Sequence, residues 1–136
     1  MALKQENHLL PQIIRLAEQC DDISVLWLYG SRASGEHHRK SDYDLAAAFT
    51  QFIRNDPFER RLRPELLAME WQKALGLGDF ELSLIDINLV PIPLAYSVIS
   101  CGRVIFCRDS IRLAQEEQRV LSRMELDIEF SRRSYG

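Results

Sequence analysis

Apolar residues in this chain fall into two patterns, short continuous runs typical of buried strands and stripes at helical spacing. The first stripe, in residues 9–17, predicts a helix in which Pro11 is tolerated only near the first turn or as a kink. A first apolar run at residues 23–29 predicts a strand, and a nearly continuous run at residues 45–49 predicts a second strand over residues 42–49. Residues 31–35, after the first run, are expected to begin a short helix or helical turn.

The second half of the chain continues this alternation of helix and strand. Asp56 and Pro57 provide an N-cap and a first-turn proline for a helix that ends near Gly76. The next elements are expected at residues 80–87 (third strand), 94–100 (short helix) and 102–106 (last short strand). Asp109 is expected to cap a C-terminal helix, and the arginines at 132 and 133 to lie in a frayed tail.

The C-terminal helix carries apolar residues on more than one side. One stripe at helical spacing contains Leu113, Val120, Leu121, Met124 and Ile128. Leu126 and Phe130 lie off that stripe, and a single small domain does not readily bury both faces of one helix. The extra apolar residues favour a surface covered by a partner protein; packing on the domain itself and a homodimer are the alternatives.

Two motifs that carry chemistry flank the turn between the first two strands. Glycine at position 30 lets the backbone approach a ligand, and the following N–H groups and the Ser31 hydroxyl can hold phosphate oxygens. Asp42 and Asp44 are spaced i, i+2, so on a strand they project from one face while Tyr43 points the other way. Paired carboxylates repel unless a cation lies between them, and Mg²⁺ with phosphate oxygens is the usual solution. Together the motifs predict chemistry on a nucleoside triphosphate, although Asp-x-Asp alone also fits a solvated strand start.

These motifs resemble the signature of the nucleotidyltransferase superfamily that includes DNA polymerase beta. The stretches Gly30-Ser31-Arg32-Ala33-x-Gly35 and Ser41-Asp42-Tyr43-Asp44-Leu45 are similar to its minimal nucleotidyltransferase (MNT) branch, and the similarity continues through Asp86-Ile87-Asn88, Pro91, Tyr96 and residues 102–106. The resemblance implies an α+β fold, a small mixed β-sheet flanked by helices. It also implies a single MNT domain over residues 1–136, with a C-terminal helix from about residue 109.

The resemblance further implies which residues act. Asp42 and Asp44 are the expected catalytic residues and ligands of two Mg²⁺ ions. Gly30, Ser31 and Arg32 are the expected nucleotide-binding residues, with ATP as the substrate. Arg32 can neutralise triphosphate charge, and a structural salt bridge is the alternative role for it.

The third strand departs from the family pattern. Family members usually carry a third carboxylate there, and ungapped alignment puts Ser83 at that position. Glu81 lies two residues earlier on the same strand face and is our choice for the third catalytic residue, as metal ligand or base. An exposed residue at a strand start is the alternative for Glu81. Asp86 faces the other way and is expected to be structural.

Composition limits the partners and the location. The chain has 136 residues, 46% of them hydrophobic, enough for one domain with a core but not for two. A net charge of −3 gives no footprint for binding long nucleic acid. We find no apolar segment long enough for a membrane span and no signal peptide. Three cysteines without C-x-x-C spacing are expected to be buried reduced thiols, which indicates a cytoplasmic protein.

The residues alone do not identify the acceptor of the nucleotide. Resemblance to stand-alone MNT proteins implies a HEPN-family RNase toxin as partner and an antitoxin that transfers AMP from ATP to a toxin tyrosine. The toxin signature R-x(4–6)-H-x-Y is absent, so this chain is expected to be the antitoxin. Two alternatives stay open: nucleotide transfer to a small hydroxylated molecule such as an aminoglycoside, and a catalytically inactive module that masks its partner.

Overall fold

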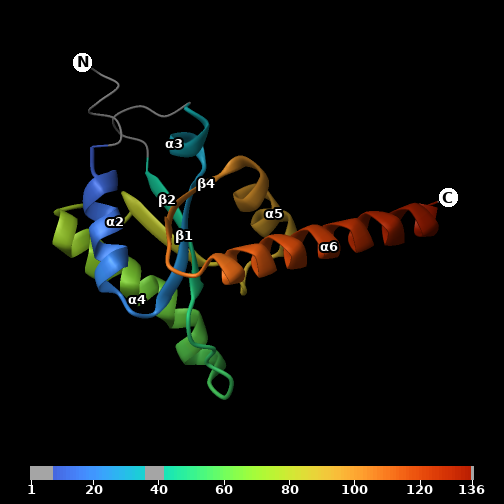
Figure 1. Ribbon diagram of the computed structural model, residues 1–136, viewed down its shortest axis with the longest axis horizontal. Coiled ribbons are helices and arrows are strands. Elements are labelled where there is room, and N and C mark those ends of the chain that lie inside the picture. Colours follow the sequence, from blue (N-terminus) through green and yellow to red (C-terminus); the bar gives the residue numbers. More distant parts are fainter. Residues whose placement is uncertain (1–7, 36–41, 136) are drawn as a thin grey trace.

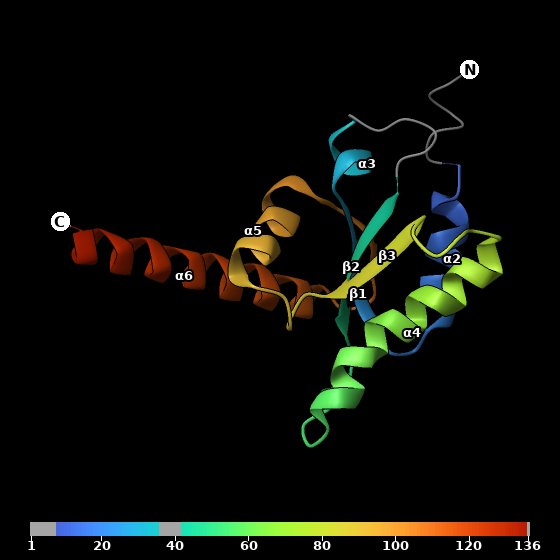
Figure 2. The same cartoon turned by 180° about the vertical axis from the view of Figure 1, so that it is seen from behind.

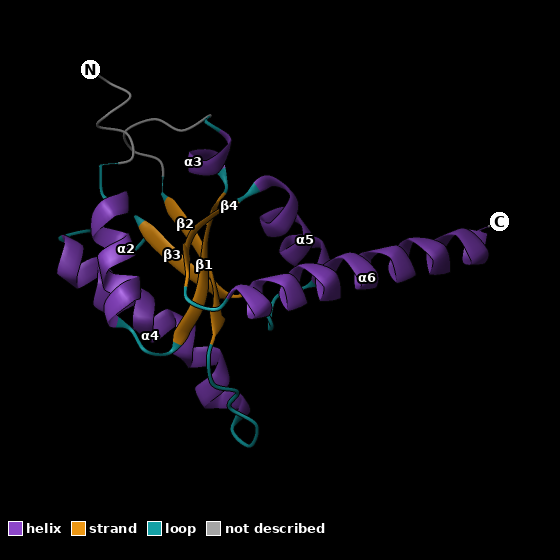
Figure 3. Cartoon of the chain, viewed as in Figure 1, coloured by secondary structure: helices purple, strands orange, loops and turns teal. Residues whose placement is uncertain are grey.

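A four-stranded sheet forms the middle layer of the molecule and separates two pairs of helices (Figure 1). The computed structural model describes residues 8–35 and 42–135. Its elements, in chain order, are α2 (Leu10–Gln19), β1 (Ile23–Tyr29), α3 (Ser31–Ser34), β2 (Tyr43–Phe49), α4 (Pro57–Leu75), β3 (Leu82–Asp86), α5 (Ile92–Cys101), β4 (Arg103–Cys107) and α6 (Ser110–Tyr135). Helices α2 and α4 cover one face of the sheet, and α5 and the first part of α6 cover the other (Figures 2 and 3). The expected small mixed sheet flanked by helices is confirmed.

The order of the strands brings three strand ends together. The order is β3-β2-β1-β4, with β1 antiparallel to β2 and β4, and β2 parallel to β3. Asp44 of β2 lies opposite Tyr29 of β1 on one side and opposite Ser83 of β3 on the other. The end of β1 and the starts of β2 and β3 therefore meet at one edge of the sheet, where α3 also lies (upper end of the sheet in Figure 1).

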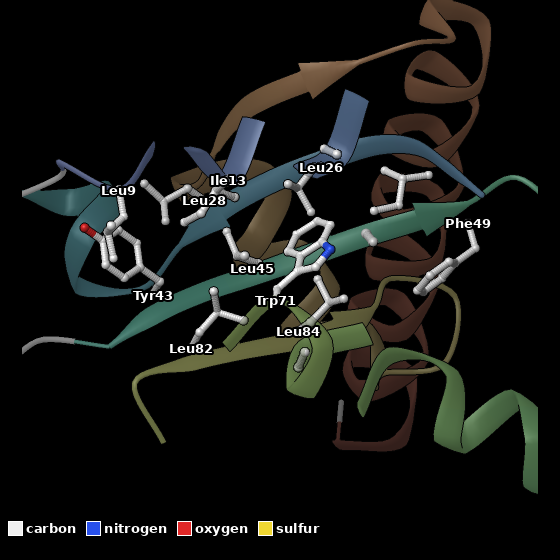
Figure 4. Close-up of a cluster of buried hydrophobic side chains, with 14 residues drawn as sticks. Leu9, Ile13, Leu26, Leu28, Tyr43, Leu45, Phe49, Trp71, Leu82 and Leu84 are labelled. Atoms are coloured by element: carbon white, nitrogen blue, oxygen red, sulfur yellow. The ribbon is translucent and has the colours of Figure 1, made fainter. Parts of the chain in front are cut away.

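Both faces of the sheet are buried, as the continuous apolar runs predict. Leu28, Leu45 and Trp71 belong to the core under α2 and α4 (Figure 4). Trp27 and Ala46 belong to a second core under α5 and α6. Because side chains alternate along a strand, each strand supplies residues to both cores.

Helix caps agree with the sequence prediction. The Asp56 carboxylate accepts a hydrogen bond from the Glu59 N–H at 3.0 Å, at the start of α4. The Asp109 carboxylate accepts from the N–H groups of Ile111 and Arg112 at 3.1 Å, at the start of α6.

Within residues 8–35 and 42–135, no helix combines the length and the apolar character that a membrane span requires.

Three local predictions are wrong. The third strand begins at Leu82 and not at residue 80, because Phe80 is 87% exposed and precedes the sheet. Helix α6 continues to Tyr135, so the arginines at 132 and 133 are helical and do not form a frayed tail. Cys101 and Cys107 are exposed thiols, on the last turn of α5 and the end of β4, rather than buried ones.

Candidate active site

Gly30 joins the two motifs of the candidate site. It follows β1 with a φ of 71° and ψ of −154°, a conformation almost restricted to glycine, and it caps the one-turn helix α3. A Cβ atom at this position would collide with Oδ2 of Asp44. The turn after β1 therefore packs directly on the second carboxylate of the Asp-x-Asp motif. Ser31, partly exposed, begins α3 at the same end of the sheet.

The charge of Asp42 acts on the Asp44 carboxyl, which agrees with the shared face that their spacing predicts. Asp42 is exposed just before β2, Asp44 is half-buried, and Tyr43 between them is buried in the opposite core (Figure 4). Burial raises the pKa of the Asp44 carboxyl above its ordinary value; the hydrogen bond from Ser83 opposes this increase, and the Asp42 charge adds to it. A cation between the two carboxylates would relieve both the repulsion and the loss of hydration.

Tyr29 and Ser83 complete the surroundings of Asp44. The Ser83 hydroxyl donates a hydrogen bond to Oδ1 of Asp44 at 3.0 Å. Burial raises the pKa of the Tyr29 phenol, and the nearby Asp44 charge raises it further. Sequence reasoning noted Ser83 only as a missing acid and did not assign Tyr29 to the site. The available signal for Tyr29 was a hydroxyl-bearing residue at the end of an apolar run, immediately before the Gly-Ser turn.

Glu81 is not brought together with the two aspartates. Its backbone carbonyl accepts the N–H of Tyr43 at 2.9 Å, which places it beside the start of β2. Its carboxylate, however, accepts the N–H of Gly78 at 2.7 Å and so caps its own turn. Across the part of the chain that the structure describes, no three His, Cys, Asp or Glu side chains gather in a group that could hold a metal ion.

Arg32 also points away from the carboxylate pair. It is 4% exposed, and its guanidinium carbon lies 3.9 Å from the centroid of the Tyr43 ring, on the side of the sheet opposite Asp44. This stacking supports a structural role for the side chain. The role of Arg32 in nucleotide binding stays a prediction, which here depends on the backbone or on a different rotamer.

Asp86 is held by structural contacts, as expected. One carboxylate oxygen accepts the N–H of Asn88 at 2.9 Å, and the other lies 3.6 Å from a guanidinium nitrogen of Arg63. The residue is 3% exposed and ends β3, at the edge of the sheet opposite the Gly30 turn.

The residues that do meet at the Gly30 turn fit a hard divalent cation. Two oxygen-donor carboxylates on one face, one half-buried and one exposed, match the way Mg²⁺ is held by one or two carboxylates together with substrate phosphates. The glycine at the turn lets the Asp44 carboxylate approach the backbone that follows β1. This arrangement can support phosphoryl or nucleotidyl transfer from one oxygen atom to another.

Comparison with known proteins identifies relatives of this chain. The family model described as polymerase beta, nucleotidyltransferase matches residues 11–111. The protein adenylyltransferase MntA of Aphanizomenon flos-aquae (strain 2012/KM1/D3) is 24% identical over 113 residues, which cover 79% of this chain and 73% of that protein.

Solved structures share the fold. A toxin–antitoxin crystal structure with AMP-PNP contains a chain that superposes with a TM-score of 0.70 at 20% identity, over 93% of this chain and 94% of that one. A complex of the tri-AMPylated Shewanella oneidensis HEPN toxin with its MNT antitoxin gives a TM-score of 0.66 at 17% identity, over 96% and 94% of the two chains.

Proposed function

We propose, since the chain belongs to the polymerase beta nucleotidyltransferase family, that it is an antitoxin that transfers AMP from ATP to a tyrosine of a partner HEPN toxin. The observation that carries the proposal is the contact between the Gly30 turn and Asp44, which brings the proposed phosphate-binding turn against one of the paired carboxylates. The choice of a protein acceptor is supported by the similarity to a protein adenylyltransferase and to MNT chains crystallised with HEPN toxins.

The chain's own residues would bind and orient the nucleotide. Asp42 and Asp44 would hold Mg²⁺, which supplies charge neutralisation at the reacting phosphate and at the leaving pyrophosphate. The backbone at Gly30 and the Ser31 hydroxyl would position the triphosphate beside Asp44. Positioning and electrostatic stabilisation account for most of the catalysis in such transfers, so the protein needs no covalent intermediate.

Glu81 is proposed as the third ligand or base, and it must first leave the Gly78 N–H. The acceptor hydroxyl loses its proton as its oxygen bonds to the α-phosphorus and pyrophosphate departs. The Glu81 backbone lies beside the start of β2, and a change of rotamer would have to carry its carboxylate toward Asp42. Glu81→Gln should therefore reduce transfer less than Asp42→Asn does.

The proposed function is tested by incubating the chain with its candidate HEPN partner and ATP labelled in the α-phosphate. Label on the partner protein is the expected result, and Asp42→Asn should remove it. Label on an added aminoglycoside, with none on the partner, would instead favour the small-molecule acceptor. If neither the partner nor the aminoglycoside is labelled and a stable complex forms, the result would favour an inactive antitoxin that masks its partner.

A further inference from the structure

Three side chains on neighbouring strands form a row beside the Gly30 turn. Asp44 of β2 is the direct cross-strand partner of Tyr29 on β1 and of Ser83 on β3. Cross-strand partners project from the same face of a sheet, so the Tyr29 and Ser83 side chains lie on either side of Asp44. None of the three is fully buried, and the row lies at the edge of the sheet where the candidate site is.

The hydrogen bond along this row has one direction. An ionised carboxylate only accepts, so the single hydroxyl proton of Ser83 is donated to Oδ1 of Asp44, at 3.0 Å. Tyr29 lies on the other side of Asp44, and burial and the Asp44 charge raise the pKa of its phenol.

Both oxygens of Asp44 are consequently fixed in direction. Oδ1 is held by Ser83, and Oδ2 lies against Gly30, where no side chain can fit. We propose that Ser83 is a positioning residue that orients Asp44 toward the metal and triphosphate. This inference rests on the proposed function, because it assigns these residues to the same nucleotide site.

Metal binding in the presence of a non-hydrolysable nucleotide tests the inference without relying on turnover. Mn²⁺ binding with AMP-PNP, followed by electron paramagnetic resonance, should weaken about 10-fold or more in Ser83→Ala, the range typical for losing a hydrogen-bond partner of a metal ligand. Ser83→Thr keeps the hydroxyl and should bind Mn²⁺ like the wild type. Tyr29→Phe should weaken binding less than Ser83→Ala does.

If Ser83→Ala fails to fold, Ser83→Cys carries the test, because a thiol is a weaker hydrogen-bond donor than a hydroxyl. Ser83→Cys should then bind Mn²⁺ more weakly than Ser83→Thr does, and equal binding by these two variants would overturn the proposal.

Ser24→Ala is the matched control. Ser24, also on β1, shares a 2.8 Å hydrogen bond with Thr50 near the opposite edge of the sheet, so its loss removes a comparable cross-strand hydroxyl contact. Mn²⁺ binding should be unchanged in this variant. Wild-type protein that does not bind Mn²⁺ with AMP-PNP would contradict the proposed function itself. Wild-type binding that Ser83→Ala leaves intact would overturn only the positioning role.

Discussion

At the scale of single residues, one missing side chain makes the site possible. Gly30 and Asp44 are far enough apart in sequence that neither motif alone indicates contact, yet no Cβ can be placed between them. Glycine at this position serves two needs, a positive φ that other residues rarely adopt and the close approach of the turn to a carboxylate. The contact places the turn beside the Asp-x-Asp motif, which a shared ligand site would require.

Replacing Gly30 should therefore weaken ligand binding in addition to straining the backbone. Gly30→Val should abolish ATP binding, measured by calorimetry, because its side chain would displace the Asp44 carboxylate. Gly35→Ala is a useful control, since it has a φ of 81° but no atom within 4 Å of an added Cβ. That control should lose about 1–2 kcal/mol of stability from strain and keep ATP binding. Unchanged affinity in Gly30→Val would show that the turn is not a phosphate site.

The half-buried carboxylate predicts a pH-dependent difference in stability without metal. Because the pKa of Asp44 is raised in the folded protein, its ionisation favours the unfolded chain. Asp44→Asn should thus be more stable than the wild type at neutral pH. The gain should shrink as the pH falls through the folded and then the unfolded pKa of the carboxyl, where Asp44 becomes neutral too. Urea unfolding at several pH values checks this, and a pH-independent difference would refute it.

At the scale of elements, the two strands with continuous apolar runs were predicted almost to the residue. The start of β3 was not, because Phe80 has the apolar character of a strand residue but is 87% exposed. The sequence did not predict that the Glu81 carboxylate accepts the Gly78 N–H, because the turn between these two residues creates that contact. The contact of Ser83 with Asp44 depends on the pairing of β2 with β3, and the sequence of one strand does not identify its partner strand.

The base of α6 is attached to the sheet by a buried ionic network. Glu116 is 5% exposed and contacts Arg112 at 3.0 Å, Arg119 at 2.9 Å and the amide of Asn88 at 2.8 Å. Glu116→Ala leaves these donors without their acceptor and should cost about 3 kcal/mol of stability. Urea unfolding measures the loss, with the exposed Glu125→Ala as the control. Equal stability of the two variants would mean that the network does not anchor the helix.

The outer part of α6 is the expected contact with the partner. Leu126 and Phe130 are 62% and 74% exposed, so packing on the domain itself does not cover them. Leu126→Asp combined with Phe130→Asp should reduce co-purification with the HEPN partner while ATP binding persists. Ile111→Asp, at the helix base and 70% exposed, is the matched control. Undiminished complex formation by the double variant would place the docking surface elsewhere.

At the scale of the whole molecule, the candidate site and α6 lie on the same face of the sheet. Asp44 alternates with Ala46 and Ala48, which face the core under α5 and α6, so the row of Asp44 opens on the same face as those helices. Helix α6 extends well beyond the rest of the chain (Figure 1). A partner held along α6 can therefore approach the Gly30 turn past α5. The chain belongs to a nucleotidyltransferase family. The α6 double variant tests whether this surface binds the acceptor protein.

The central claim is that this chain uses Asp42 and Asp44 to transfer AMP to a partner tyrosine. Intact-mass and peptide mass spectrometry of the HEPN partner, co-expressed with wild-type chain or with Asp42→Asn, tests it most directly. The account predicts one or more AMP units on a partner tyrosine with the wild type and none with Asp42→Asn, while the complex still forms. An unmodified partner with the wild type, or equal modification with Asp42→Asn, would contradict it.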